Sequence, residues 1–247
     1  MTDRFHDSAG VPWEGRQFEA NPWAGDDGEA PAELALALAD RPVDKTSLFE
    51  ALTSSRLLVP LVASLGESET GAHGMTVDKS ADLAIVAVAT PDKQTAIPVF
   101  SSVAEMSAWQ PDARPVPIEA ARVALAAAAE GHSRVILNPG TNPVAIRRPA
   151  LAALAQQLPW TPPHADSWVQ EWAKSVAGKF SLIAAIDLFD GDPNSDLSHA
   201  ELLVQLAIKP VGGDEVRKLL TDFTEQLRSD EFQQRVDSIG YRLVVAN

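Results

Sequence analysis

The chain contains no cysteine among its 247 residues. This absence excludes disulfide bonds, thiolate nucleophiles and zinc sites that use cysteine. Long apolar runs are also missing: none is longer than the run Leu83 to Ala89, which is far shorter than the ~20 residues that a membrane helix needs. The first ten residues, MTDRFHDSAG, hold no apolar segment of the kind found in signal peptides. The sequence therefore predicts a cytoplasmic protein with no attachment to a membrane.

Basic clusters are scarce as well. The formal net charge is −14, and the densest basic point is the pair Arg147–Arg148. Because phosphates are recognised by grouped Lys and Arg side chains, this charge predicts no binding to nucleic acid or to anionic membranes. Residues 1–40 alone carry nine carboxylates against two arginines. Such a negative surface keeps a protein soluble, and it also suits a basic protein partner.

Motifs of catalysis and nucleotide binding are absent too. The sequence has no GxxxxGK[ST], GxGxxG, GxSxG or HExxH, and no two of its five histidines are spaced for one helical turn. Ser101–Ser102 follows a predicted strand, where a nucleophile could sit, but capping of the next helix explains the same residues. His73 lies in a polar loop, which is an ordinary place for a solvated histidine. The sequence thus predicts no catalytic residue and no cofactor, and favours a protein that is not an enzyme.

Residues 1–30 are predicted to form an acidic tail, because they are rich in Gly, Pro and carboxylates and lack any helical or strand period. Two similar fragments recur near this end of the chain, PWEG at 12–15 and PWAG at 22–25. Each indole ring can bury on the order of 200 Å². We therefore expect Trp13 and Trp23 to be anchors, either on the body of this chain or on a partner.

Residues 31–157 have the pattern of a first α+β domain. Capping residues and apolar periodicity predict helices at 31–39, 44–53, 103–109, 117–129 and 149–157. Short apolar runs predict strands at 57–62, 81–89, 95–100, 135–137 and 144–146. The pairs 81–89 with 95–100 and 135–137 with 144–146 are expected to be hairpins, and 81–89 is the clearest buried strand. Pro60 donates no hydrogen bond, so the first strand is expected at a sheet edge.

The proline-rich segment 158–164 predicts a semi-rigid linker. Residues 165–247 then form a second small domain, with predicted helices at 165–177, 214–228 and 230–236 and predicted strands at 180–189, 201–208 and 241–245. Asp214 is expected to cap the helix that it introduces. The predicted fold class is therefore α+β: two small domains, each a mostly antiparallel sheet covered by helices, behind a tail that contains tryptophan.

Four stretches, taken in order, resemble one known family: LLVPLV, DKSADLAIVAVATPDKQTAIPVFSS, MSAWQPDARPVP and VILNPGTNPVAIRRPALAAL. Together they are similar to the SseB N-terminal domain over roughly residues 30–157. The tail pattern and residues 165–247 resemble the tail and second domain of longer, actinobacterial members. The resemblance implies an α+β fold in a bacterial cytosol, and it implies no reaction and no catalytic residue.

Residues 190–201 can be aligned with the loop of a calcium-binding EF-hand. The alignment makes oxygen ligands of Asp190, Asp192, Asn194, Asp196 and Glu201. However, Ser195 stands where the sharp turn of that loop requires Gly, and Pro193 stiffens the chain. The flanking residues also have the pattern of strands rather than of EF-hand helices. An acidic hairpin loop that binds no metal is therefore the favoured interpretation.

Five further residues lie at strand ends or element junctions, where functional groups often collect. We predict that a ligand-facing rim is formed by Phe100, Ser101, Trp109, Asn138 and Gly140, although each also has a structural role available. The function predicted from the sequence is a non-enzymatic protein-binding or regulatory module. The alternative is a small-molecule site, sensory or catalytic, between the two domains. A deep pocket there, holding a carboxylate of strongly raised pKa, would favour this alternative.

Overall fold

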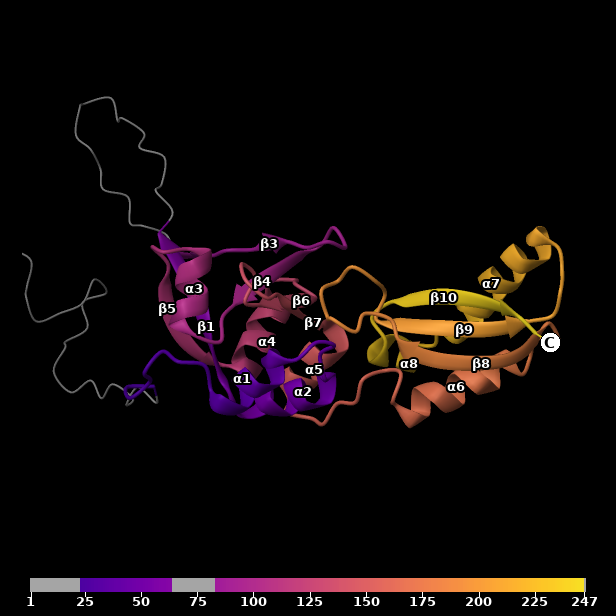
Figure 1. The fold of residues 1–247 in the computed structure, drawn as a ribbon, viewed down its shortest axis with the longest axis horizontal. Helices are drawn as coiled ribbons and strands as arrows, with labels where there is room; N and C mark the ends of the chain where they lie inside the picture. The colour runs from indigo at the N-terminus through magenta and orange to yellow at the C-terminus, as the bar shows by residue number, and fades with distance from the viewer. Residues whose placement is uncertain (1–22, 64–82, 247) are drawn as a thin grey trace, which may run out of the picture.

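Figure 1 shows the computed structural model, which describes residues 23–63 and 83–246. Helices and mostly antiparallel strands make up this part of the chain, which confirms the α+β class. The ribbon has an N-terminal half, residues 23–157, and a C-terminal half, residues 165–246, placed end to end along the long axis. Each half has its own hydrophobic core. Within the described ranges, no helix is long and apolar enough to cross a membrane.

The N-terminal half contains two sheets. In the first, β1 (Arg56–Ala63) pairs antiparallel with both β2 (Leu83–Ile85) and β5 (Arg114–Glu119). The second has the order β3-β4-β6-β7, built from β3 (Val88–Ala89), β4 (Thr95–Val99), β6 (Arg134–Leu137) and β7 (Val144–Arg147). A bridge between Leu58 and Phe100 joins the two sheets. One core can therefore form against both of them.

Helices complete the N-terminal half. They are α1 (Ala32–Ala39), α2 (Lys45–Ser54), α3 (Val103–Trp109), α4 (Ala120–Ala129) and α5 (Arg148–Gln156). The side chain of Asp44 accepts hydrogen bonds from the first turn of α2, and Ser102 does the same for α3. The apolar faces of α1, α2, α4 and α5 pack with the strands to form the main core. Local capping and tertiary burial thus specify the same elements.

Three predictions for this half are wrong. The run 81–89 is not one buried strand, because its described residues are divided between β2 and β3, which belong to different sheets. β1 is the central strand of its sheet and not an edge. It tolerates Pro60 because β2 pairs only from Leu61 onward. Residues 114–119, predicted as turn and helix, form β5, whose position at an edge accommodates its two prolines.

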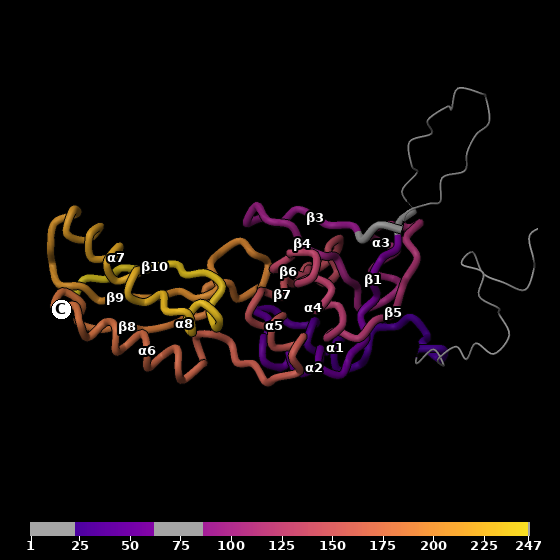
Figure 2. Tube along the Cα trace, turned by 180° about the vertical axis from the view of Figure 1, so that it is seen from behind, coloured from indigo at the N-terminus to yellow at the C-terminus, as the bar shows by residue number. Residues whose placement is uncertain are grey.

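The C-terminal half is a three-stranded sheet with helices packed on it. β9 (Leu202–Ile208) lies between β8 (Ile183–Asp190), which is antiparallel to it, and β10 (Ile239–Val245), which is parallel. Alternate residues of β9 are buried, because one face packs on α6 (Ser167–Ala177), α7 (Gly213–Leu227) and α8 (Asp230–Arg235). Figure 2 shows the molecule from the side of α7 and α8.

The prediction that Asp214 caps α7 is wrong. Helix α7 begins at Gly213, so Asp214 already lies within its first turn and pairs with Arg217 instead. The capping contact is made by Glu215, whose carboxylate accepts a hydrogen bond from Gly212 N–H at 3.2 Å. Both carboxylates still favour the helix, because they lie at the positive end of its dipole.

The loop between β8 and β9 reaches across to the N-terminal half. Val43 N–H donates to Pro193 O at 2.8 Å, and Ala145 N–H donates to Ser195 O at 2.6 Å. Leu197 is 3% exposed and forms a small apolar cluster with Ala96, Ile136 and Ala145. The predicted acidic hairpin loop is therefore partly internal, and it fastens the two halves together.

Candidate functional site

An open groove with a volume of about 670 Å³ lies on the N-terminal half. Aromatic, apolar and acidic side chains line it, among them Trp23, Phe49, Glu50, Glu119, Leu158 and Trp160. The rings of Phe49 and Trp160 pack with their centroids 5.3 Å apart. Leu158 is 53% exposed, which is unusual for a leucine beside two packed rings. The groove therefore presents apolar surface between two carboxylates.

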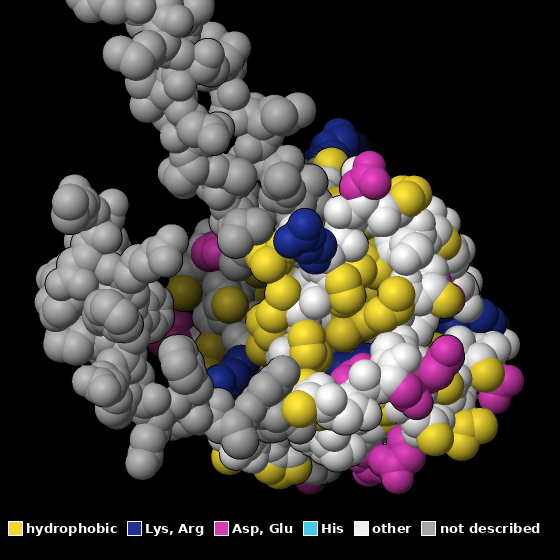
Figure 3. All heavy atoms as spheres, turned by 90° about the vertical axis from the view of Figure 1, so that its left-hand side faces the viewer, with side chains coloured by type: hydrophobic (Ala, Val, Ile, Leu, Met, Phe, Trp, Pro, Cys, Tyr) yellow, Lys and Arg dark blue, Asp and Glu magenta, His cyan; other side chains and the backbone are white. Residues whose placement is uncertain are grey.

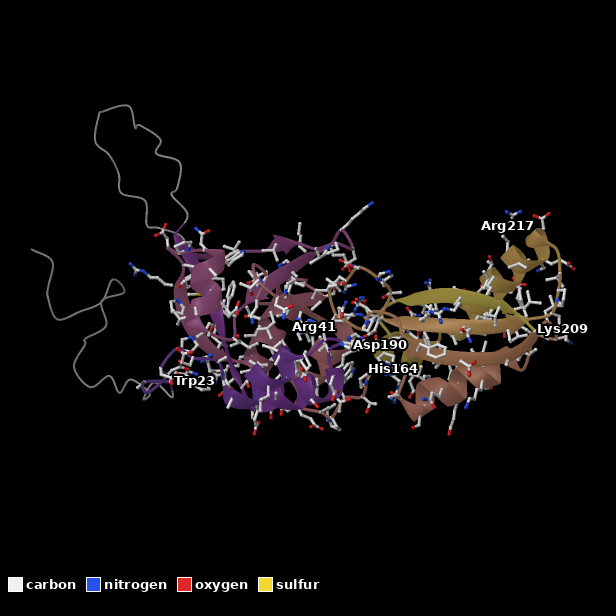
Figure 4. All side chains as sticks on the ribbon, in the orientation of Figure 1. Trp23, Arg41, His164, Asp190, Lys209 and Arg217 are labelled. Atoms are coloured by element: carbon white, nitrogen blue, oxygen red, sulfur yellow. The ribbon has the colours of Figure 1, made fainter. Side chains whose placement is uncertain are left out.

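The segment that carries Trp23 is held on the body by Arg56. The Arg56 guanidinium is buried, pairs with Asp26 and donates to Glu29 O at 2.5 Å. The hydrogen bond from Arg56 keeps the pKa of Asp26 below its usual value, with burial opposing it. Trp23 itself is half-buried, at the end of the N-terminal half that is remote from the C-terminal half (Figure 4). Trp13, the other predicted anchor, lies outside the described residues.

A second constellation lies where the two halves meet. Arg134 and Arg147 stand directly opposite each other on β6 and β7, and both side chains are almost fully buried. Like charges in this position destabilise a sheet unless a counter-charge lies between them. Asp237, which precedes β10, supplies that charge at 2.8 Å from Arg134 and 3.2 Å from Arg147. Asp92 adds a further pair with Arg134 at 2.5 Å.

The C-terminal half contributes two more buried carboxylates to this junction. Asp192 pairs with Arg147 at 2.6 Å, and Glu201 accepts a hydrogen bond from Asp237 N–H at 2.6 Å. Burial raises the pKa of Glu201 to about 7, and the charge of Asp237 adds to the rise. The backbone hydrogen bond, Arg147 and Lys45 act in the opposite direction. The junction thus holds a carboxylate whose pKa is raised by burial.

The cavity beside Glu201 is small. It has a volume of about 30 Å³, room for about two water molecules. Its lining includes Lys45, Arg147 and Trp160. The charged groups there are already paired, since Lys45 binds Asp190 and Arg147 binds Asp192. The arrangement can hold the halves together and store a proton, but it offers no space for a metabolite.

The five residues of the predicted rim do lie together. Phe100 is fully buried and its ring packs 5.3 Å from that of Trp109. Asn138 accepts from Ser101 N–H at 2.9 Å and donates to Ser101 Oγ at 3.0 Å. A Cβ at Gly140 would meet Trp109 at 3.2 Å, so the backbone there packs directly on the indole. These residues pack against or hydrogen-bond to one another. Whether they also face a ligand is not tested by these contacts, so the ligand-facing rim stays a prediction.

The candidate calcium ligands point to separate partners. Asp190 pairs with Lys45, Asp192 with Arg147, and Glu201 with the backbone of Asp237. Asp196 accepts from Ser198 N–H within its own turn at 2.9 Å. In residues 23–63 and 83–246, no three His, Asp or Glu side chains gather in a way that could hold a metal ion. The loop uses its carboxylates to connect the two halves.

Titration of the protein with millimolar Ca²⁺ is expected to produce no saturable heat in a calorimeter, because binding would have to break these ion pairs. Asp196→Asn, a change in a part-exposed carboxylate of the loop, is the matched variant. A saturable heat that this substitution removes would contradict the expectation.

Residues 32–153 match the SseB protein N-terminal domain. By this domain, the chain belongs to the SseB family. The resemblance drawn from the sequence is thereby confirmed for the N-terminal half. Neither a curated protein nor a solved structure matches the chain.

The SseB domain supplies only part of each site. It contains Phe49 and Glu50 of the groove, whereas Trp23 and Trp160 lie outside the matched residues. At the junction it contributes the arginines, and the C-terminal half contributes the carboxylates Asp192, Glu201 and Asp237. The predicted rim, in contrast, lies wholly within the SseB domain.

Sequence reasoning did not identify Arg134, Asp237 or Trp160 as site residues. The predicted 135–146 hairpin held the signal for the first, because pairing around its turn places Arg134 opposite Arg147. Trp160 follows Pro159 in the predicted linker, so it is a third Pro-Trp dipeptide, in a segment with little use for an indole unless the ring packs. Asp237 had no local signal, since Arg134 and Arg147, which bind its carboxylate, are 103 and 90 residues away.

Proposed function

We propose that this SseB family protein is a protein-binding module of the bacterial cytosol and that the groove is its binding site. The observation that supports this proposal is an exposed leucine beside two packed aromatic rings, between carboxylates. Aromatic side chains are enriched where proteins bind one another, because they give a large contact area at a low entropic cost. An open groove of this size suits an extended segment rather than a small metabolite.

The charges around the groove define the partner further. Glu50 and Glu119 line it, and the chain as a whole carries a net charge of −14. On the end of the N-terminal half that faces the viewer in Figure 3, acidic side chains gather below the apolar area, and single basic side chains also lie beside it. A basic partner would be attracted by this field, at a rate that falls with added salt. We therefore propose that the groove binds a segment with an apolar anchor next to Lys or Arg.

The junction between the halves is the second candidate, because it holds the carboxylate of raised pKa that a small-molecule site would require. Its cavity of about 30 Å³ is far below the several hundred Å³ of ordinary ligand pockets. A ligand could enter only if the halves separated and the buried ion pairs broke. We therefore assign the junction to holding the halves in place.

Affinity capture from the native cytosol tests the groove. Leu158→Asp and Glu50→Lys are expected to reduce capture of the partner about tenfold or more, since they remove an apolar contact and reverse a charge at the binding site. Leu36→Asp is the matched control, because Leu36 is 74% exposed on α1 and does not line the groove.

The same capture experiment is repeated with a partner whose charge is reversed. If its basic residue is changed to Glu, binding is expected to return with the Glu50→Lys protein and to be lost with the native one. Equal capture by the native chain and by both groove variants would place the binding site elsewhere.

A further inference from the structure

We propose that the groove is occupied by the chain's own residues 12–16, Pro-Trp-Glu-Gly-Arg, when no partner is bound. This proposal rests on the groove being the binding site of the proposed function. It adds an occupant that the partner must displace, so that the tail regulates access to the site.

The sequence near the N-terminus contains an internal repeat. PWEG at 12–15 and PWAG at 22–25 place the same Pro-Trp pair ten residues apart. The second copy supplies Trp23, which lines the groove. An indole of the first copy would add to the same apolar wall, beside Trp160 and Leu158.

The two copies of the repeat carry opposite charges at the same position. The residue three positions after Trp23 is Asp26, and it holds its repeat on the body by pairing with Arg56. The residue three positions after Trp13 is Arg16, which has the opposite sign. Among the described residues, Glu50 has no ion-pair partner, and Glu119 pairs only with the exposed Arg122, at 3.5 Å. The two groove carboxylates therefore complement Arg16 as Arg56 complements Asp26.

The chain between the two copies is long enough for the first to reach the groove. Trp23 already lies at the groove, and the ten residues back to Trp13 span at most about 35 Å when extended. Trp13 can therefore return to the groove from its own anchor point. A tethered segment also has an effective concentration in the millimolar range. Even a weak contact then keeps the groove occupied.

The absence of cysteine permits a direct test by disulfide trapping in the full chain. A cysteine at Glu14→Cys is combined with Thr53→Cys, an exposed position of α2 that lines the groove. The control combines Glu14→Cys with Leu36→Cys, an exposed position of α1 in the same half that does not line the groove. The rate of the intramolecular disulfide is measured under mild oxidation.

We expect the groove pair to cross-link at least tenfold faster than the control pair. Trp13→Ala or Glu50→Lys, added to the groove pair, is expected to slow it to the control rate. Equal rates for the two pairs would overturn the proposal, and a disulfide formed only between molecules would assign the groove to the tail of a second copy.

Partner capture separates this proposal from the proposed function. If the tail occupies the groove, removal of residues 1–22 strengthens capture of the partner, whereas loss of capture would mean that the tail itself carries recognition. If the groove pair does not cross-link but the partner is still captured in a way that depends on Leu158, only the proposal that the tail occupies the groove is rejected. If the groove pair cross-links rapidly but no partner is captured, only the proposal of an external partner is rejected.

Discussion

Arg147→Ala is expected to lower the free energy of unfolding by about 3–5 kcal/mol, because it leaves buried carboxylates without their counter-charge. Asp192 loses an ion pair of 2.6 Å, and its side chain is only 2% exposed. Asp237 keeps Arg134 but loses its contact with Arg147 at 3.2 Å. Arg147 also donates to His199 O at 2.7 Å, so a backbone acceptor loses its donor as well.

Urea denaturation at pH 7 measures this effect. Arg122→Ala is the control, since Arg122 is 76% exposed and its pair with Glu119 is long, at 3.5 Å; such a change usually costs less than about 0.5 kcal/mol. Similar losses for the two variants would show that the junction contributes little. The m-value also matters: if it falls, the halves no longer unfold as one cooperative unit.

Glu201→Gln is expected to abolish a loss of stability that the native protein undergoes between about pH 5 and 8. Burial raises the pKa of Glu201 from 4.5 to about 7, so the folded state binds a proton that the unfolded state releases. That contribution is complete below pH 4.5 and is lost as the pH rises through 7. Its full size is about 3 kcal/mol. Glutamine keeps the oxygen that accepts from Asp237 N–H and carries no charge.

The difference in free energy of unfolding between the native protein and the Glu201→Gln variant reports on the Glu201 carboxylate alone. The pKa values of Asp26, Asp44, Asp92 and Asp196 are lowered, and their contributions are lost as the pH falls, which is the opposite direction. They are common to both proteins and cancel in the difference. The free energy of unfolding, measured by urea at several pH values, is expected to favour the Gln variant increasingly above pH 5. A constant difference across this range would show that Glu201 is ionised throughout.

Features with local causes could be predicted from the sequence. The caps Asp44 and Ser102 bond to backbone amides two or three residues away, and the 134–147 hairpin turns at consecutive Asn, Pro and Gly residues. Trp23 was singled out because an indole is out of place in a polar tail, and its role as an anchor stays a prediction. These elements require no knowledge of the rest of the molecule.

Features with distant causes could not be predicted. Pro60 suggested an edge strand, but β1 is a central strand. On one side of β1, Leu58 pairs with Phe100 before Pro60 and β2 pairs from Leu61 after it, so Pro60 itself has no partner there. This arrangement depends on where β2 lies in the fold. Asp237 and Arg134 are 103 residues apart, and neither has a local pattern typical of burial. The groove likewise combines four separate stretches of chain. Periodicity reports which face of an element is buried, but not which other element covers it.

The contact of Leu197 has a consequence for synthesis on the ribosome. The N-terminal half is complete at residue 157, but Leu197 and Asp237 are made 40 and 80 residues later. At 5–20 residues per second, roughly 4–16 s pass before Asp237 exists. During that time the nascent N-terminal half leaves Ala96, Ile136 and Ala145 without the cover of Leu197, Arg147 without its carboxylate partners, and Arg134 with Asp92 alone. The nascent chain is therefore most vulnerable to aggregation in this interval, and a chaperone that shields this face would act on the N-terminal half before the stop codon is reached.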